Sequence, residues 1–433
     1  MIKDPSELLL RIALRTLKQI NPYALVLNEL KKNVTLRLSK GDKRIWYEKI
    51  FILGVGKGAS KMAEATEKHF GAKITEGFII IPKGEPAPHL KKIKWIRGSH
   101  PLPDQNGLKG AKEILKIAQK ASKKDLVITL ISGGGSALMP YPMEGITLEE
   151  KIKTTSLLLK CGANINEINT VRKHLSQIKG GRLMEAIYPA TCLNFVISDV
   201  LGDDLSAIAS GPVSPDKTTS QQALKIFGKY KILKKIPYSV IQCLKKGIET
   251  PKPGNKIFKK VTSKILANHE TTVNVAQVVA KKILGKICAV KILNKQMAGD
   301  CNETARKVIK TIGNKKGLFI LAGETTVKVI GNGHGGRNQQ FVLACLREFS
   351  KKRNPLPFVV LSIGTDGVDG FCPEKIAGAI ATQETLKKGL DIEKYLNRND
   401  SYGFFKRANG LIKTGPTGTN LGDLVLILLL HDG

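Results

Sequence analysis

The chain has 433 residues, of which 42% are hydrophobic and 24% are charged, a composition that excludes a disordered or fibrous protein. With 70 basic and 36 acidic residues the formal net charge is +34, but the lysines are scattered as doublets without an RGG tract or interleaved aromatic residues. Together with the absence of any apolar run long enough to span a bilayer, this predicts a solvated basic surface that attracts small anionic substrates, and neither nucleic acid nor membrane as a partner.

The N-terminal segment is expected to begin a helix rather than to direct export. Asp4 is suited to cap the helix, Pro5 fits its first turn, and Glu7 lies where a capping box needs an acid. This pattern differs from a secretory or transit signal. The seven cysteines form no C-x-x-C pair, which argues against a zinc site and a disulfide scaffold. We therefore expect a cytoplasmic protein with reduced thiols.

Three apolar runs in the first half each end in a turn rich in glycine or aspartate that leads toward a helical pattern. They read KIFILGVGKGASKMA, DLVITLISGGGSALM and NFVISDVLGDDLSAIASGP. Continuous apolar strands that alternate with helices are typical of buried parallel strands joined in βαβ units. The first half is therefore expected to form an α/β domain with a mainly parallel sheet.

The first glycine turn carries a lysine. Gly54 and Gly56 belong to a G-x-G-x-x-A match at a strand-to-helix junction, where backbone amides favour a phosphate or a carboxylate. A NAD site would need an acid at the end of the following strand, but Pro82 and Lys83 stand there. What remains is Lys57, placed to neutralise an anion, although a simple packing turn explains the glycines equally well.

The second turn runs from Ser132 through Gly133, Gly134 and Gly135 to Ser136. Three successive glycines cost stability through chain entropy, and they are tolerated where the backbone must approach a ligand closely. Successive amides also form an anion-binding nest. We therefore expect these five residues to bind nucleotide or substrate, with a flexible loop as the alternative.

A run of cations follows in the segment NEINTVRKHLSQIKGGRL. Arg172, Lys173, Lys179 and Arg182 recur there at roughly helical spacing. Such a run is typical of the solvated face of a helix.

Aspartates follow two of the predicted strands. Asp199 lies after the strand in ISDVLGDD, and Asp366 lies after the strand in GTDGVDG. Because loops at the carboxyl ends of strands carry the chemistry of open α/β sheets, we expect Asp199 and Asp366 to bind magnesium or to accept a hydroxyl proton. Their neighbours Asp203, Asp204 and Asp369 are expected to be helix caps or turn residues.

The second half is expected to form a separate α/β domain. ETPKPGNK indicates a linker, and TTVKVIG alternates between apolar and polar residues, which predicts a mixed sheet. The predicted domains are residues 1–243 and 256–433, with the active site in the cleft between them.

The stretch GNGHGGRNQQ concentrates four glycines before a helical pattern. It predicts a loop of free amides that ends at Gly335 and Gly336, with Arg337 and Asn338 at the start of the helix. An arginine there opposes the helix dipole by up to about 1 kcal/mol, which makes sense if an anion lies between it and the amides. A plain connector is the alternative.

Taken together, these stretches resemble the type-2 glycerate kinases, the family whose C-terminal part is the MOFRL domain. The resemblance extends in order through GVGKGASKMA, GSHPLPDQNG, SGGGSALM, INEINTVRKHLSQIKGGRL, ISDVLGDDLSAIASGPVSPD, AGETTVKVIGNGHGGRNQQ, GTDGVDG and NDSYGFFKRANGLIKTGPTGTNLGDL. It therefore covers nearly the whole chain.

The resemblance implies a Rossmann-like large domain, a smaller MOFRL domain and the phosphorylation of D-glycerate to 2-phosphoglycerate with ATP and Mg²⁺. In this family the lysine of the first glycine turn and the arginine of G-G-R-N-Q are proposed active-site residues, and they correspond to Lys57 and Arg337 here. We expect these two side chains to clamp the transferred phosphoryl group, while Asp199 or Asp366 positions magnesium or takes the hydroxyl proton.

Departures from the family pattern lie on the MOFRL side. Gln340 replaces the usual acid, FCPEKIAG follows GTDGVDG, and TNLGDL has a glycine where a larger residue is usual. They bear on substrate preference more than on reaction type. Two alternatives stay open: an NAD(P)H-dependent hydroxypyruvate reductase, a label that family members formerly carried, and a non-enzymatic nucleic-acid-binding protein driven by the positive charge.

Overall fold

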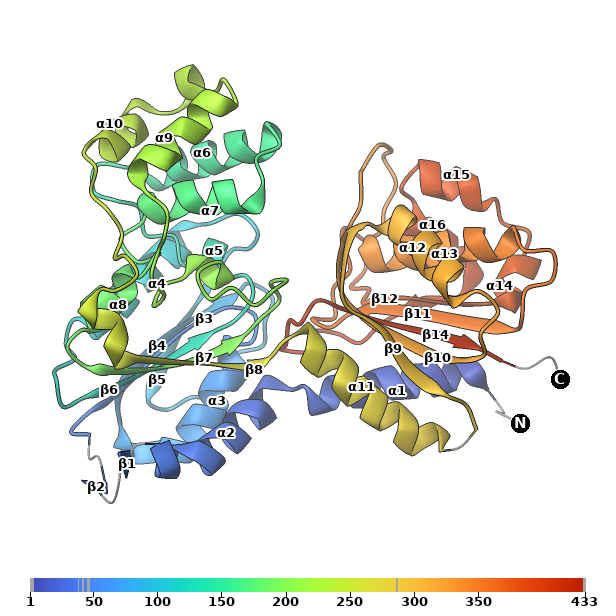
Figure 1. The fold of residues 1–433 in the computed structure, drawn as a ribbon, viewed down its shortest axis with the longest axis horizontal. Helices are drawn as coiled ribbons and strands as arrows, with labels where there is room; N and C mark the ends of the chain where they lie inside the picture. The colour runs from blue at the N-terminus through green and yellow to red at the C-terminus, as the bar shows by residue number, and fades with distance from the viewer. Residues whose placement is uncertain (1–3, 38, 41–42, 45–46, 286, 431–433) are drawn as a thin grey trace. The chain divides into compact units, whose positions relative to one another are not determined.

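The structure is a computed structural model, and it describes residues 4–37, 39–40, 43–44, 47–285 and 287–430. The chain divides into two compact units (Figure 1). The large unit is Pro22–Leu266, and the small unit joins Met1–Asn21 to Ala267–Gly433. Among the described residues, no helix combines the length and the apolar character needed to cross a bilayer.

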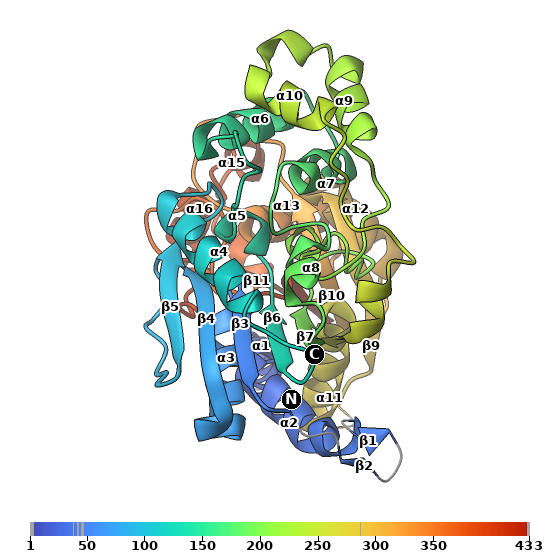
Figure 2. The same ribbon diagram turned by 90° about the vertical axis from the view of Figure 1, so that its left-hand side faces the viewer.

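The large unit is built on a six-stranded sheet in the order β5-β4-β3-β6-β7-β8 (Figure 2). The strands are β3 (Ile50–Val55), β4 (Ile74–Pro82), β5 (Ile93–Gly98), β6 (Leu126–Ile131), β7 (Thr191–Ile197) and β8 (Val261–Ala267). The pairs from β5 to β7 are all parallel. Counted from β3, the order is 3-2-1-4-5-6, which is that of the doubly wound nucleotide-binding fold, so the predicted parallel α/β architecture is confirmed.

Helices cover both faces of this sheet. In Figure 1, α2 and α3 lie on one face and α4, α5 and α8 lie on the other, while α6, α7, α9 and α10 form a further helical layer with its own apolar core. The bounds are α2 (Pro22–Arg37), α3 (Ala59–Phe70), α4 (Gln105–Ala118), α5 (Gly135–Leu138), α6 (Leu148–Lys160), α7 (Ile165–His174), α8 (Arg182–Ile187), α9 (Ser220–Lys229) and α10 (Tyr238–Lys245). Because both faces are covered, every residue of β3 and β6 is buried.

The small unit contains a second six-stranded sheet, in the order β13-β12-β11-β14-β10-β9. The strands are β9 (Val290–Asp300), β10 (Gly317–Thr326), β11 (Phe358–Gly364), β12 (Gly378–Thr382), β13 (Leu411–Ile412) and β14 (Asp423–Leu429). β9 and β10 are parallel, whereas β14 is antiparallel to both β10 and β11. The sheet is therefore mixed, as predicted.

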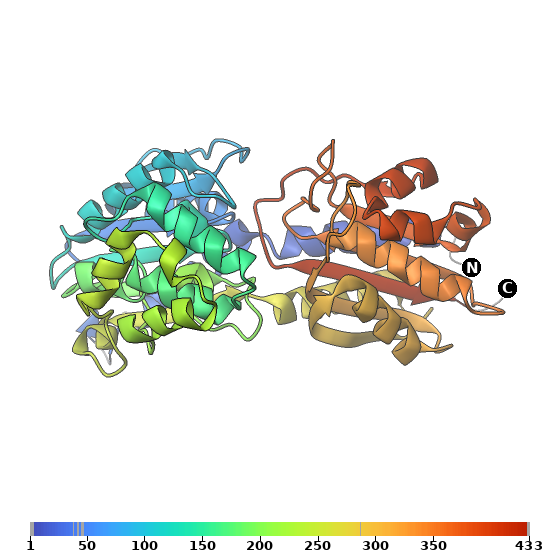
Figure 3. The same cartoon turned by 90° about the horizontal axis from the view of Figure 1, so that it is seen from above.

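Helices also flank the small sheet. On one side α12 (Cys301–Ile312) and α13 (Arg337–Ser350) run side by side, drawn in gold and orange in Figure 3. Beyond them lie α14 (Gln383–Lys387), α15 (Ile392–Asn397) and α16 (Ser401–Ala408).

The first helix, α1 (Pro5–Gln19), belongs to the small unit although the predicted boundaries place it in the N-terminal domain. Asp4 caps it by accepting from the amides of Ser6 and Glu7, as the sequence predicts. Its buried face packs against α11 (His269–Leu284) and against the small sheet. An amphipathic helix packs on whichever apolar face the fold leaves open, so proximity in sequence did not decide its place.

Candidate active site

Two glycine turns are locked together at the carboxyl ends of β3 and β6. The Lys57 amide donates to the Gly133 carbonyl at 2.9 Å, and the Gly58 amide donates to Ser132 Oγ at 2.9 Å. A Cβ added to Gly56, whose φ is +124°, would lie 2.2 Å from Ser132 Oγ. The Ser132 hydroxyl is fully buried and therefore joins the two turns to each other. This is the point where the strand order reverses, which is the usual ligand site of such sheets.

The Lys57 side chain lies along the second turn. A Cβ built on Gly134, which has a φ of +85°, would stand 3.6 Å from Lys57 Cγ and 3.2 Å from His100 Cδ2. Lys57 is half-buried, and His100, which follows β5, is exposed. The structure thus brings the predicted lysine and the predicted triple-glycine turn together, and it adds a histidine that the motif-by-motif reasoning did not single out.

Two further glycines of these turns serve packing. A Cβ on Gly54 would meet Ile79 Cγ2 at 2.7 Å, and a Cβ on Gly135 would meet Ala209 Cβ at 2.7 Å. Both positions therefore require glycine because another element packs directly against the backbone.

Ser136 begins a polar chain that leads away from the turn. Its Oγ lies 2.8 Å from Ser210 Oγ, and Ser210 Oγ donates to Asn169 Oδ1 at 3.2 Å. Asn169 Oδ1 also accepts from Arg172 Nη1 at 3.0 Å. The half-buried Ser136 is thus connected to the cations of α7, a link that spacing along the chain did not reveal.

The cation run itself corrects the sequence analysis. Lys173 and Lys179 are buried, and Arg172 is half-buried, so this is not a solvated helix face. Lys173 pairs with the buried Asp216 at 3.2 Å. The spacing predicted a helix, but α7 ends at His174, so Lys179 lies beyond it and Arg182 begins α8. The spacing also could not show that Asp216 and the Ala209 carbonyl contact Lys173 and Lys179.

In the small unit, Arg337 starts α13 and is held by carboxylates. Its Nε and Nη2 donate to the two oxygens of Asp423 at 2.7 and 3.1 Å, and its Nη1 donates to Glu324. The anion that the sequence predicts beside Arg337 is therefore present within the protein. Asp423 begins the antiparallel strand β14, so it faces the ends of β10 and β11. Sequence reasoning examined only residues after strands and missed it.

Asp369 caps the same helix. Its carboxylate accepts from the amides of Asn338 and Gln339, each at 2.9 Å, which confirms a capping role for Asp369. Asn338 is buried, and its Nδ2 donates to Asp423 at 2.8 Å and to Asp369 at 3.2 Å. Asn338 therefore separates two buried carboxylates and bonds to both.

Burial dominates the protonation of these acids. It raises the pKa of Asp423 to about 6, against the opposing effect of Arg337, and it also raises the pKa of Asp369. Burial alone would lower the pKa of Arg337, but Asp423 and Glu324 raise it, so the guanidinium stays charged. Three acids thus surround one arginine, and the protonation of Asp423 near its pKa of about 6 changes the charge that this group carries.

The glycine-rich loop before α13 is packed rather than open. The amides of Gly331, Gly333 and Gly335 each donate to an oxygen of the protein, at 2.9, 2.9 and 3.0 Å. A Cβ on Gly336 would lie 2.3 Å from Asp369 Oδ1. The concentration of glycine thus has a structural cause here, namely the close approach of neighbouring loops.

The two predicted metal ligands lie in different units. Asp199 is half-buried two residues beyond β7, and Asp366 is half-buried two residues beyond β11, with its Oδ1 accepting from the Val368 amide at 3.0 Å. Within the described part of the chain, no three His, Cys, Asp or Glu side chains are grouped to hold a metal. Magnesium commonly binds through one or two carboxylates and the phosphates of its substrate, so single aspartates suit an ion that arrives with a nucleotide.

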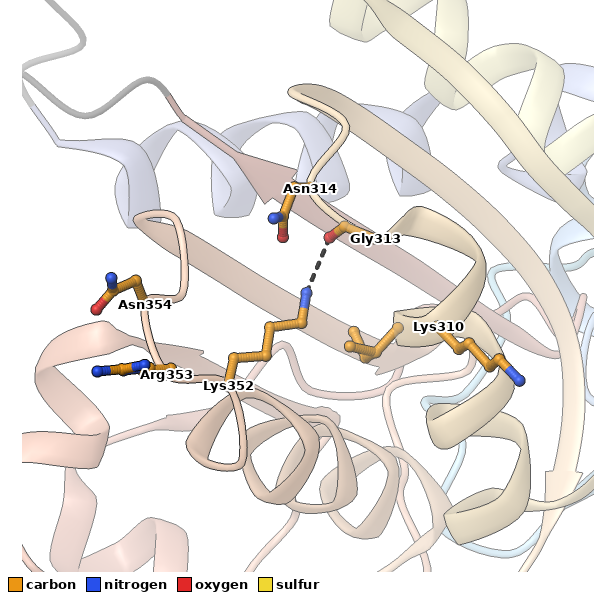
Figure 4. A pocket seen from close by; sticks show the side chains of 7 residues that line it. Lys310, Gly313, Asn314, Lys352, Arg353 and Asn354 are labelled. Atoms are coloured by element: carbon orange, nitrogen blue, oxygen red, sulfur yellow. Dashed lines mark hydrogen bonds between the residues drawn. The ribbon is translucent and has the colours of Figure 1, made fainter.

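A separate cavity of about 570 Å³ lies on the small unit (Figure 4). It is lined by Ile309, Lys310, Gly313, Asn314, Lys352, Arg353 and Asn354. Lys352 Nζ donates to the Gly313 carbonyl across it at 2.9 Å. Arg337 and Lys352 lie at opposite ends of α13, about 20 Å apart for a helix of 14 residues, so this cavity is distinct from the Arg337 cluster.

Comparison with known proteins places this architecture in a family. Residues 8–245 match a domain of unknown function, DUF4147, and residues 317–423 match the MOFRL family. The D-glycerate 2-kinase of Thermotoga maritima is 38% identical, over 88% of this chain and 91% of that protein. The glycerate 2-kinase of Pyrococcus horikoshii is 36% identical, over 98% of both chains. This chain belongs to the glycerate 2-kinase family.

Solved structures of the glycerate 2-kinase family agree with this assignment. The crystal structure of the Thermotoga maritima glycerate kinase has a TM-score of 0.84 to this chain at 36% identity, and the match covers 98% of this chain and 99% of that one. Another relative, from Agrobacterium vitis, is 35% identical over 87% of this chain and 86% of its own length, and is named a putative hydroxypyruvate reductase. The family is one of phosphotransferase enzymes, and the predicted resemblance is confirmed.

Four residues that surround the two glycine turns or Arg337 were not predicted from the individual motifs. They are His100, Ser210, Glu324 and Asp423, and each lies in a stretch that resembles the family, GSHPLPDQNG, SAIASGP, AGETT and TNLGDL. The signal was therefore present in the long motifs, but none of the four follows directly on a predicted strand with a glycine turn.

Proposed function

We propose that this enzyme transfers the γ-phosphoryl group of magnesium-bound ATP to the C2 hydroxyl of D-glycerate, giving 2-phosphoglycerate and ADP. The observation that carries the proposal is the pair of interlocked glycine turns at the reversal point of a 3-2-1-4-5-6 sheet, with Lys57 lying along them. The curated relatives support the acceptor, since they are named for D-glycerate and for glycerate.

Phosphoryl transfer requires alignment and charge neutralisation more than covalent chemistry by the protein. The hydroxyl oxygen of glycerate forms a bond to the γ-phosphorus while the bond to the β,γ-bridging oxygen breaks, and ADP leaves. We assign Lys57 and the amides of Gly133, Gly134 and Gly135 to the transferred phosphoryl group and its neighbouring phosphates. Magnesium enters as part of the nucleotide substrate and neutralises charge on the phosphates.

Arg337 is the second cation of the proposal. Asp423 grips its Nε and Nη2, so the guanidinium plane is fixed, while Nη1 faces Glu324, which is 40% exposed. We propose that Arg337 exchanges Glu324 for a phosphoryl oxygen when substrates bind. Asp423 is then a positioning residue. Of Asp199 and Asp366, we propose that one binds the magnesium ion and that the other accepts the proton of the glycerate hydroxyl.

One assay tests the function. The full chain is incubated with ATP, Mg²⁺ and D-glycerate, and the product is identified by ³¹P NMR against authentic 2- and 3-phosphoglycerate. We expect 2-phosphoglycerate and an equal amount of ADP. Formation of the 3-isomer would overturn the regiochemistry, and absence of any phosphoglycerate would overturn the function.

The name of the Agrobacterium vitis relative favours a second candidate, the reduction of hydroxypyruvate. In this chain β4 ends at Pro82, and the nearby Asp104 is occupied by the Lys83 ammonium at 2.9 Å and by the Gly107 amide at 2.8 Å. Asp104 is thus engaged within the protein and is not presented to the ribose of a dinucleotide. Oxidation of NADH or NADPH by hydroxypyruvate in the presence of the protein would establish this candidate instead.

A further inference from the structure

The large unit encloses a group of cations beyond Ser136. Lys151 comes from α6, Arg172 from α7, and Lys179 from the segment that follows α7, in the region where Figure 1 shows α6 and α7 above α5. Lys179 is completely inaccessible to solvent, and Lys151 is 5% exposed. These three residues are called the buried cation cluster below.

The buried cation cluster lacks a counter-charge. In the portion of the chain that the structure describes, no carboxylate forms an ion pair with any of its three members. Lys151 Nζ donates to the Leu175 carbonyl at 2.9 Å, and Lys179 Nζ donates to the Ala209 carbonyl at 3.4 Å. The neighbouring Lys173, by contrast, has Asp216.

An uncompensated buried charge is costly, and proteins normally pair it or let it lose its proton. Burial, together with the nearby charges of Lys151 and Arg172, lowers the pKa of Lys179. Burial and Arg172 likewise lower the pKa of Lys151 to about 7, while the Cys243 thiol acts in the opposite direction. The arrangement therefore costs stability in the absence of an anion.

The segment that faces the cluster is itself strained. Ala209 and Ser210 both adopt left-handed φ values, of +50° and +61°, although neither is glycine. This backbone conformation is strained for residues other than glycine, and such strain is found mainly at functional sites. Ser210 Oγ contacts Ser136 Oγ and Asn169 Oδ1, so the strained segment links the triple-glycine turn to Arg172.

We infer that Lys179 and Arg172, with the hydroxyls of Ser136 and Ser210, form an oxyanion subsite adjoining the turn along which Lys57 lies. An entering oxyanion supplies the missing negative charge. The Ser136 hydroxyl turns from Ser210 to donate to it, while Ser210 keeps its bond to Asn169 and holds the segment in place. The identity of the oxyanion rests on the proposed function, which offers two sources. They are the carboxylate of the acceptor acid and a phosphate of the nucleotide.

The first experiment measures binding by isothermal titration calorimetry to the full chain, to Lys179→Met and to Arg172→Gln. The probes are D-glycerate, Mg²⁺–ATP and inorganic phosphate, each used alone. Lys153→Met is the matched control, because Lys153 lies on α6 like Lys151 but is exposed. Charged hydrogen bonds contribute enough that we expect at least a tenfold loss of affinity in both test variants and none in the control.

The pattern of loss identifies the source. Loss confined to D-glycerate assigns the subsite to the carboxylate, and loss confined to Mg²⁺–ATP assigns it to a phosphate. Unchanged affinity for all three probes in both variants overturns the inference, as does failure of the unaltered chain to bind any of them. Where Lys179→Met fails to fold, as judged by circular dichroism, Ser136→Ala and Arg172→Lys take its place with the same expectation.

A measurement on the unaltered chain needs no variant. Because an anion stabilises the charged form of a nearby lysine, binding is expected to take up protons at neutral pH. Titrations in two buffers of different ionisation enthalpy measure this uptake, and zero uptake with every probe that binds contradicts the inference. The two proposals fail separately: lysine-dependent anion binding without phosphoglycerate formation removes only the function, whereas normal catalysis with unchanged KM values in Lys179→Met removes only the subsite.

Discussion

Lys57 lies just before α3 and Arg337 is the first residue of α13, yet the surroundings of these two cations differ. Lys57 follows a buried strand, and its side chain lies beside the backbone of Gly134 in the second glycine turn. Arg337 is surrounded by Asp423, Glu324 and Asp369. A cation beside the backbone of a glycine turn can attract a phosphate directly. A cation held by carboxylates is fixed in orientation, but the carboxylates neutralise part of its positive charge, so its attraction for a phosphate is weaker.

Loss of the Lys57 ammonium is expected to remove catalysis without unfolding the protein. We predict that Lys57→Ala lowers kcat for phosphoglycerate formation about 10³-fold or more, since this is the cost of losing a charged group that stabilises the transferred phosphoryl. Lys68→Ala, at an exposed position on α3, the helix that follows the turn of Lys57, is the control. A Lys57→Ala enzyme with a normal rate would remove this residue from the mechanism.

Titration of Asp423 is expected to shape the pH profile. With a pKa of about 6, Asp423 is neutral below that pH and grips Arg337 as a carboxylate above it. We therefore predict that kcat rises as the pH passes through about 6. We also predict that Asp423→Asn has a low kcat at every pH and does not show this rise. Persistence of the rise in Asp423→Asn would assign it to another group.

The same shift has a consequence for stability. A pKa raised from 3.8 to about 6 means that the folded protein binds a proton which the unfolded chain has already lost. The contribution of Asp423 to the free energy of unfolding is therefore greatest below pH 4 and falls as the pH rises toward 6. Urea unfolding of the unaltered chain and of Asp423→Asn across this window should show a shallower decline in the variant.

At the scale of elements, the important contact is that between the turns after β3 and β6. Gly56 and Ser132 come from different βα units, and their contact is so close that a single methyl group would not fit. The two turns therefore form one rigid platform for Lys57. A rigid platform lowers the reorganisation needed when charge develops on the phosphoryl group.

This platform is testable with a pair of glycine substitutions. Gly56 and Gly84 both have positive φ, +124° and +88°, but a Cβ would clash only at Gly56 and would meet nothing within 4 Å at Gly84. Backbone strain affects both, so their difference isolates the clash. We predict that Gly56→Ala lowers the free energy of unfolding by about 1–3 kcal/mol more than Gly84→Ala. Equal destabilisation in urea titrations would show that the turns can separate freely.

At the scale of the whole molecule, the chain begins in one unit, builds the other and then returns. α1 lies within the small unit, and Leu9, Ile12 and Ala13 are fully buried there. The N-terminal helix is therefore part of the core that supports the sheet of Arg337, although it precedes Lys57 in sequence. The small unit is consequently built from two segments that are separated in sequence by the whole of the large unit.

This placement predicts which unit is destabilised by substitutions in α1. Ile12→Ala should cost about 2–5 kcal/mol, because a buried side chain leaves a cavity. Leu14→Ala on the same helix, at a side chain 44% exposed, should cost about 0.5 kcal/mol or less. In hydrogen exchange, Ile12→Ala is expected to deprotect α11 and the small-unit sheet. Deprotection confined to residues 22–266 would contradict the assignment.

The sequence by itself determined the parallel sheet of the large unit, the mixed sheet of the small unit and the two glycine turns with Lys57. These features depend on local patterns: continuous apolar runs for strands buried on both sides, and glycine where the backbone bends tightly at a strand end. Such patterns are written in neighbouring residues, so they can be recognised without the fold. The long family motifs carried the reaction type in the same way.

Only the tertiary structure decided which charges meet. Asp423 lies 86 residues from the arginine that it holds, and it stands at the start of an antiparallel strand rather than at the end of a parallel one. The cations of the α7 segment are solvated by every local criterion, yet Lys173 and Lys179 are buried. They contact Asp216 and the Ala209 carbonyl, which come from a segment about 40 and 30 residues further along the chain. Burial and pairing depend on which elements pack together, and no periodicity within one helix reports the helix that covers it.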